Sequence, residues 1–222
     1  MAAPCDLRFD CGRICLDLAA TSGAPAERLT GDGPTGERLT GPDQLRAWLV
    51  GAGLVPRGTP LDGVDGGWVG RFRALRDLLR RVVHDELRGR AADADLALLN
   101  SAAAAGQPPA PCAVRTADGA LAAALPGPPD CAGLLAAVAR DAICLLTDPA
   151  ARAQLRQCAG ESCTLVYLDT SRGRRRRWCS SEVCGNRERV ARHRRRTTVR
   201  RGQDGSAGQG LVTGAEKFSA EL

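Results

Sequence analysis

The stretch CAGESCTLVYLDTSRGRRRRWCSSEVCGNRERVARHRRR at residues 158–196 decides the fold of the last third of the chain. It has the cysteine pattern C-x4-C-x15-C-x4-C, formed by Cys158, Cys163, Cys179 and Cys184. Two close cysteine pairs with a spacer of this length are typical of structural zinc sites, in which thiolates fill all four ligand positions. The pattern therefore predicts one Zn²⁺ ion held by these four residues.

The residues between and after the pairs predict a small finger around this metal. Residues 164–169 favour a β-strand, residues 170–174 contain turn formers, and residues 175–179 can return as a second strand. Residues 182–196 favour a helix. A cysteine turn, a hairpin, a second cysteine turn and a helix together predict a treble-clef-like zinc finger. Because so short a spacer buries little apolar surface, we expect zinc binding, worth about 10–16 kcal/mol in model fingers, to drive its folding.

Arginines are concentrated in the same region. Residues 171–201 contain thirteen arginines and two glutamates, a net charge of +11, whereas the whole chain carries +6 and the remainder therefore −5. Such a local excess is typical of a surface that binds a polyanion, because each phosphate contact releases condensed counterions. A basic block can also be a disordered tail or a solubilising surface. Here the cysteines interleaved with the arginines favour an ordered surface.

Helix geometry separates these arginines into two groups. Arg187 shares a face with Val183 and Val190, so we expect it to point inward and to form a structural pair with Asp169, because a buried guanidinium needs a carboxylate. Phosphate binding by Arg187 is the alternative. The arginines expected to contact nucleic acid lie on the hairpin arm and on the outer helix face: Arg174, Arg175, Arg176, Arg177, Arg189, Arg192 and Arg196.

Two further residues of the finger each have two interpretations. Trp178 either shields the metal or stacks on a base, and shielding is favoured beside a zinc ligand. Asn186 either ties the cysteine turn to the helix, which we favour slightly, or reads an adenine edge.

The first 150 residues predict a mostly helical domain with one small hairpin. Apolar residues recur every three or four positions, with proline or aspartate at the expected helix starts. Asp93 or Asp95 is expected to cap one helix, Asp130 another, and the helix from Asp148-Pro149 is expected to run into Cys158. The expected helices cover residues 43–50, 68–87, 93–105, 130–146 and 148–158, and Asp118-Gly119 predicts a hairpin within residues 112–125.

The remaining cysteines and the hydropathy bear on location. The sequence has no apolar leader at its start and no apolar run near 18 residues, so it predicts a cytoplasmic protein without a membrane segment. Cysteines stay reduced in the cytoplasm. The six cysteines outside the finger are therefore expected to be small core residues: Cys5, Cys11, Cys15, Cys112, Cys131 and Cys144. The glycine-rich residues 202–222 predict a disordered tail.

Residues 158–196, with CGNR at residues 184–187, resemble the CGNR zinc finger at the C-terminus of bacterial stress-induced transcription regulators. In that family the finger follows an ABATE-type domain, to which LDLAAT at 16–21 and AWLVGAGL at 47–54 are similar. The resemblance implies an ABATE-like domain at residues 1–150, a CGNR-type finger with a basic helix at 151–201, and DNA binding.

The expected fold class is mainly α (α+β), with a helical N-terminal domain followed by the treble-clef-like finger. The expected function is that of a bacterial transcription regulator whose finger binds DNA, while the acidic helical domain forms a homodimer or senses a signal. The alternative is an RNA- or ribonucleoprotein-binding zinc module. We expect no enzyme, because an all-cysteine zinc site is closed and the chain has only two histidines and no phosphate-binding glycine loop.

Overall fold

The computed structural model describes residues 7–22, 36–161, 163–192 and 194. Contacts between Cα atoms divide the chain into two compact units, Met1–Cys179 and Ser180–Leu222, and each unit is described by itself. The expected tail at residues 202–222 lies outside the described residues, as does Arg196.

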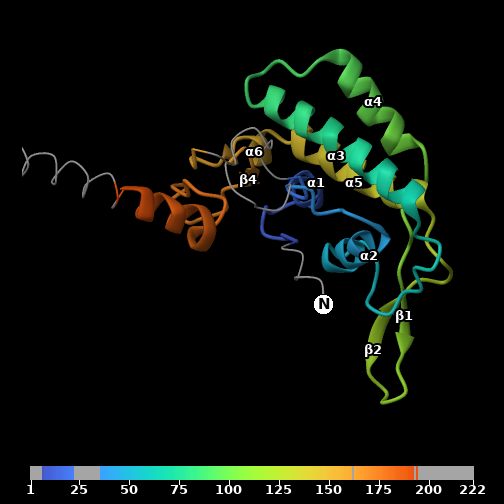
Figure 1. Cartoon of the computed structure of the whole chain (residues 1–222). Helices are drawn as coiled ribbons and strands as arrows, with labels where there is room; N and C mark the ends of the chain where they lie inside the picture. The colour runs from blue at the N-terminus through green and yellow to red at the C-terminus, as the bar shows by residue number, and fades with distance from the viewer. Residues whose placement is uncertain (1–6, 23–35, 162, 193, 195–222) are drawn as a thin grey trace, which may run out of the picture. The chain divides into compact units, whose positions relative to one another are not determined.

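The first unit is built from helices and two small antiparallel hairpins (Figure 1). Its helices are α1 (Ile14–Ala19), α2 (Pro42–Gly51), α3 (Gly66–Glu86), α4 (Asp93–Ala104), α5 (Cys131–Thr147) and α6 (Pro149–Arg152). Strand β1 (Cys112–Arg115) pairs with β2 (Leu121–Ala124), and β3 (Leu155–Gln157) pairs with β4 (Val166–Leu168). The fold is mainly α with some β, as the sequence predicts.

The core lies where α3, α4 and α5 pack against one another and α1 packs on both α3 and α5 (Figure 1). The apolar stripe of α3 faces this core: Phe72 and Leu79 have no exposed surface. Trp48 of α2 meets Phe72 edge to face, with ring centroids 6.0 Å apart, a geometry that aromatic pairs prefer. The amphipathic pattern of residues 68–87 is therefore satisfied by helix-on-helix packing.

Two of the predicted helix caps are confirmed and one is wrong. The Asp130 carboxylate accepts a hydrogen bond from the Gly133 N–H, and that of Asp148 from the Ala150 N–H, both at 2.8 Å. Helix α4, by contrast, follows Ala92, and no side chain caps it. The carboxylate of Asp95 instead pairs with Arg81 of α3 at 2.9 Å, so a tertiary ion pair takes the place of the local cap.

The N-terminal segment before α1 is tied down by a buried carboxylate. Asp17 is only 6% exposed and accepts a hydrogen bond from the Cys11 N–H at 3.0 Å. Burial raises the pKa of the Asp17 carboxyl to about 6, because desolvation disfavours the charged form.

The region before Cys158 differs from the prediction. Helix α6 ends at Arg152, and the chain then forms β3, so no helix runs into Cys158. Strand β4 pairs with β3, with Leu155 opposite Leu168, and residues 175–179 form no strand. Leu155 and Leu168 are both buried, so the pairing places apolar side chains from both strands in the interior, which short-range propensity does not reveal.

The hairpin at residues 112–125 is confirmed, and Gly119 has the positive φ of +84° that its turn requires.

The prediction of six core cysteines is wrong in two cases, because Cys112 and Cys144 are exposed. The described cysteines that are buried as predicted are Cys11, Cys15 and Cys131, while Cys5 lies outside the described residues. No helix in the described part of the chain is long and apolar enough to cross a membrane.

Candidate metal centre and arginine surface

The four predicted ligands come together. The Sγ atoms of Cys158, Cys163, Cys179 and Cys184 all lie within 4.8 Å of one another. The Sγ atoms of Cys163 and Cys179 are 3.7 Å apart, close to the roughly 3.8 Å edge of a tetrahedron with Zn–S bonds of about 2.3 Å. The donor set therefore fits one metal ion that prefers soft ligands.

The first cysteine pair is presented by a tight turn after β3. The Cys158 N–H donates to the Leu165 carbonyl at 2.8 Å, and the Cys163 N–H donates to the Gly160 carbonyl at 3.0 Å. The Ala159 N–H donates to the Arg177 carbonyl at 2.8 Å, which brings the segment that carries Cys179 towards the first pair. Backbone hydrogen bonds therefore help to bring these ligands together.

Hydrogen bonds also prepare the sulfur of Cys158. Those donated by the Cys163 and Cys179 thiols, together with one from the Cys179 backbone N–H at 3.3 Å, lower the pKa of the Cys158 thiol. Because the thiolate is the form that binds metal, these hydrogen bonds favour the ligand form of Cys158, while they raise the pKa of the Cys163 thiol that donates one of them.

In the second unit, Cys184 lies in a π-helical turn, η2 (Ser181–Gly185). The Gly185 N–H donates to the Ser180 carbonyl at 2.9 Å, and residues 186–192 continue as an α-helix. A wide turn of this kind is frequent at functional sites. The helix predicted for residues 182–196 is thus present in the described residues, with a π turn at its start.

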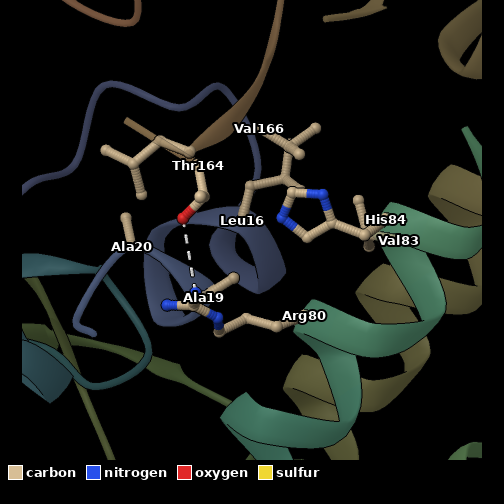
Figure 2. Close-up of a pocket in the computed structure, with 9 residues that line it drawn as sticks. Leu16, Ala19, Ala20, Arg80, Val83, His84, Thr164 and Val166 are labelled. Atoms are coloured by element: carbon tan, nitrogen blue, oxygen red, sulfur yellow. Dashed lines mark hydrogen bonds between the residues drawn. The ribbon is translucent and has the colours of Figure 1, made fainter. Parts of the chain in front are cut away.

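The β3–β4 hairpin belongs to the same unit as the helices. The Leu168 N–H donates to the Cys11 carbonyl at 2.9 Å. Arg80 and His84 of α3 reach toward the segment that leads into β4, and Arg80 donates to the Thr164 hydroxyl at 3.4 Å (Figure 2). The cavity among these residues measures about 10 Å³, room for about one water molecule. The contact between this segment and the C-terminal part of α3 is therefore nearly close-packed.

His84 behaves as a packing residue at this contact. It hydrogen-bonds the backbone of Thr164, and its burial lowers the pKa of the imidazole. In the described residues, the only cluster with metal-ligand geometry is the cysteine cluster, which does not include His84.

Arg176 has a structural position, unlike the neighbouring arginines. Its guanidinium lies 4.4 Å from the Tyr167 ring centroid and donates to the Trp178 carbonyl at 3.0 Å and to the Cys179 carbonyl. The Tyr167 hydroxyl donates to the Arg176 carbonyl at 2.6 Å. These contacts hold the guanidinium inside the finger and leave less of it for a phosphate.

Asp169 is fully buried at the end of β4. Its carboxylate accepts hydrogen bonds from the Ser171 hydroxyl at 2.5 Å and from the Arg176 N–H at 3.0 Å. The hydrogen bond from Ser171 is the main reason that the pKa of the Asp169 carboxyl is lowered. This carboxylate therefore fixes the turn that carries the arginine arm.

The inward orientation predicted for Arg187 is not observed. Its side chain is exposed on the helix of the second unit, and Val190 on the same predicted face is 49% exposed. The pairing of Arg187 with Asp169 stays a prediction, while the exposure favours the alternative of phosphate binding.

The other described arginines predicted to contact nucleic acid are exposed. On the arm these are Arg174, Arg175 and Arg177, and on the helix Arg189 and Arg192. The Arg177 guanidinium lies 5.1 Å from the Trp178 ring centroid, and Arg189 donates to the Asn186 side-chain oxygen at 2.7 Å. Asn186 thus contacts Arg189 within its own helix, and its role in tying the cysteine turn to the helix stays a prediction.

Sequence reasoning missed one residue of this site. Arg8 donates to the Cys179 Sγ atom at 3.1 Å and to the Cys179 carbonyl at 2.7 Å, although the two residues are 171 positions apart. No local pattern signals such a contact.

Comparison with known families agrees with this arrangement. Residues 12–149 match the ABATE family, described as a putative stress-induced transcription regulator. Residues 154–197 match the CGNR zinc finger family. No curated protein matches the chain. Since the first match alone spans more than half of the 222 residues, the chain belongs to the ABATE family, and its residues 154–197 form the match to the CGNR zinc finger.

Proposed function

We propose that the protein binds one Zn²⁺ ion through its four clustered cysteines and binds duplex DNA through the arginines around them. Coordination of the ion supplies folding free energy to a module that is too small to be stabilised by apolar burial alone. The arginines supply the contacts with phosphates. The family description of a transcription regulator supports this assignment.

The observation that carries the proposal is the exposure of arginines on an ordered frame. Arg174, Arg175 and Arg177 are exposed on the arm, which Asp169 fixes by hydrogen bonds to its own turn. Arg174 adopts a left-handed φ of +47°, a conformation unfavourable for a non-glycine residue. A surface whose only role was solubility would not need such a defined turn.

The alternative partner is RNA or a ribonucleoprotein. Binding to RNA or a ribonucleoprotein would use the same charges, so it is an outcome of the test below. We also propose that the protein has no catalytic role, since four cysteine ligands leave no open position on a zinc ion for a water or a substrate.

The test is a titration of the zinc-loaded full-length chain with duplex DNA, an RNA hairpin and single-stranded RNA, followed by fluorescence anisotropy at several salt concentrations. Contacts from six arginines give a slope of log K against log salt of about −5 on duplex DNA. Selection from a random DNA pool then measures sequence preference. Equal or tighter RNA binding favours the alternative, and a slope near zero contradicts both assignments.

A triple variant identifies the surface. Changing Arg174, Arg175 and Arg177 to Gln removes three charges from the arm, and we expect a loss of affinity with a shallower salt slope. The matched control changes exposed Arg57, Arg71 and Arg90 of the helical unit to Gln, which alters net charge equally. Equal losses in both triple variants indicate a nonspecific effect of net charge and contradict the assignment to the arm.

Homodimer formation through the helical unit stays a prediction. The large apolar side chains exposed there include Leu98 at 56% and Leu121 at 70%. Sedimentation of the wild type and of Leu121→Asp tests it: a dimer that dissociates in the variant supports an interface at the β1–β2 hairpin.

A further inference from the structure

Arg8 contacts the cysteine cluster from far away in the sequence, because 171 positions separate it from Cys179. Its guanidinium donates to the Cys179 Sγ atom at 3.1 Å and to the Cys179 carbonyl at 2.7 Å. The Asp10 carboxylate receives two further hydrogen bonds from the same guanidinium, at 3.0 and 2.7 Å. The planar group is thus clamped on one side by Asp10 and presents its other donors to Cys179.

The chain around Arg8 is held against the finger by its backbone. The Cys11 carbonyl accepts a hydrogen bond from the Leu168 N–H at 2.9 Å. Gly12 has a φ of +91°, and a Cβ atom placed there would lie 3.1 Å from the Leu168 Cβ atom. Any larger residue would therefore combine backbone strain with a tight contact. This close approach fixes where the N-terminal segment passes Cys179.

The electrostatics of a zinc site give this contact a role. A Zn²⁺ ion with four thiolates carries a net charge of −2, and a donor on a ligand sulfur stabilises that charge. The Arg8 side chain is only 14% exposed, so water screens the interaction less than at the surface. Arginine also keeps its charge at any physiological pH.

We propose that Arg8 is a positioning residue of the metal centre, which holds Cys179 in its ligand orientation and neutralises part of the charge of the loaded site. Arg8 lies outside both family matches, which begin at residues 12 and 154. The N-terminal segment before α1 thus contributes to zinc affinity from outside the stretch that matches the zinc finger family. This inference rests on the zinc binding proposed above.

The test compares zinc affinity in full-length Arg8→Gln and Arg13→Gln by competition with a chromophoric chelator. Arg13 is the matched control: it belongs to the same segment, pairs with the Asp141 carboxylate at 2.7 Å and also donates to the Asp141 carbonyl at 3.0 Å. Its guanidinium hydrogen-bonds Asp141, and the cysteines that it influences electrostatically, Cys15 and Cys144, lie outside the cluster. We expect a loss of about 10–100-fold in zinc affinity for Arg8→Gln and less than about twofold for Arg13→Gln.

Cobalt supplies a second readout that a purely structural role would not change. With Co²⁺ in place of zinc, loss of the Arg8 cation should move the sulfur-to-cobalt charge-transfer band to lower energy, because the sulfur electrons are less stabilised. The Arg13→Gln spectrum should match the wild type.

The outcomes separate the two proposals. Unchanged affinity and spectrum in Arg8→Gln overturn the role of Arg8, as do equal losses in both variants, which would indicate a general effect on the fold. Failure of the proposed zinc binding appears differently, as wild-type protein that takes up no stoichiometric zinc or as Cys158→Ser that binds it equally well.

Discussion

The Arg176 guanidinium lies 4.4 Å from the Tyr167 ring centroid, and the Tyr167 hydroxyl donates back to the Arg176 carbonyl at 2.6 Å. This reciprocal contact distinguishes Arg176 from the exposed arginines on either side of it. It also connects the arm to β4, whose neighbouring residue Leu168 is hydrogen-bonded to Cys11.

Arg176→Gln should therefore destabilise the protein by about 2 kcal/mol, the sum expected for a cation–π contact and charged hydrogen bonds to carbonyls. Urea unfolding of the zinc-saturated chain measures this loss. Arg175→Gln is the control, because Arg175 is exposed, and its stability should stay within about 0.5 kcal/mol of the wild type. Equal stability of the two variants would contradict the structural role of Arg176.

Arg187→Gln should weaken DNA binding while leaving zinc content unchanged and stability within about 0.5 kcal/mol, as expected for an exposed side chain. Anisotropy, metal analysis and thermal unfolding provide the three measurements. A marked drop in the melting temperature with unchanged DNA affinity would instead support the predicted pairing with Asp169.

Asp17→Asn tests the buried carboxyl of the N-terminal segment. The folded pKa of about 6 lies above the ordinary value of 3.8, so the folded state binds the proton more tightly. The resulting stabilisation is complete below pH 3.8 and is lost as the pH rises through 6. Between pH 7 and pH 5 the wild type should therefore gain about 1.4 kcal/mol relative to Asp17→Asn.

Urea titrations of the two zinc-saturated proteins at each pH measure this difference directly. Asparagine can still accept the hydrogen bond from the Cys11 N–H, so the comparison isolates the charge. A difference that does not vary with pH would show that Asp17 does not titrate in this range.

Metal removal should unfold the finger more than the helices. Metal analysis is expected to give one zinc per wild-type chain and almost none for Cys158→Ser, since removal of one ligand opens the site. Cys144→Ser, at an exposed cysteine outside the cluster, is the control and should keep its zinc. After chelation, amide hydrogen exchange should increase in β3 and β4 and remain slow in α3 and α5. Uniform loss of protection would show instead that metal and helices unfold as one unit.

The sequence alone predicted the features that depend on local chemistry. The cysteine spacing identified the four residues that cluster, because two close thiolate pairs with such a spacer are typical of structural metal sites. The period of apolar residues located α3, and the Asp118-Gly119 turn located the β1–β2 hairpin. Each of these signals is complete within a short stretch of chain.

Only the tertiary structure decided which strand pairs with β4, which arginine is structural and which distant residue touches a ligand. Burial of Leu155 opposite Leu168 brings β3 to β4, and the Tyr167 ring receives Arg176 from among five arginines that are alike in sequence. Arg8 reaches Cys179 from 171 positions away. Such contacts depend on how folded elements pack, so composition and periodicity do not predict them.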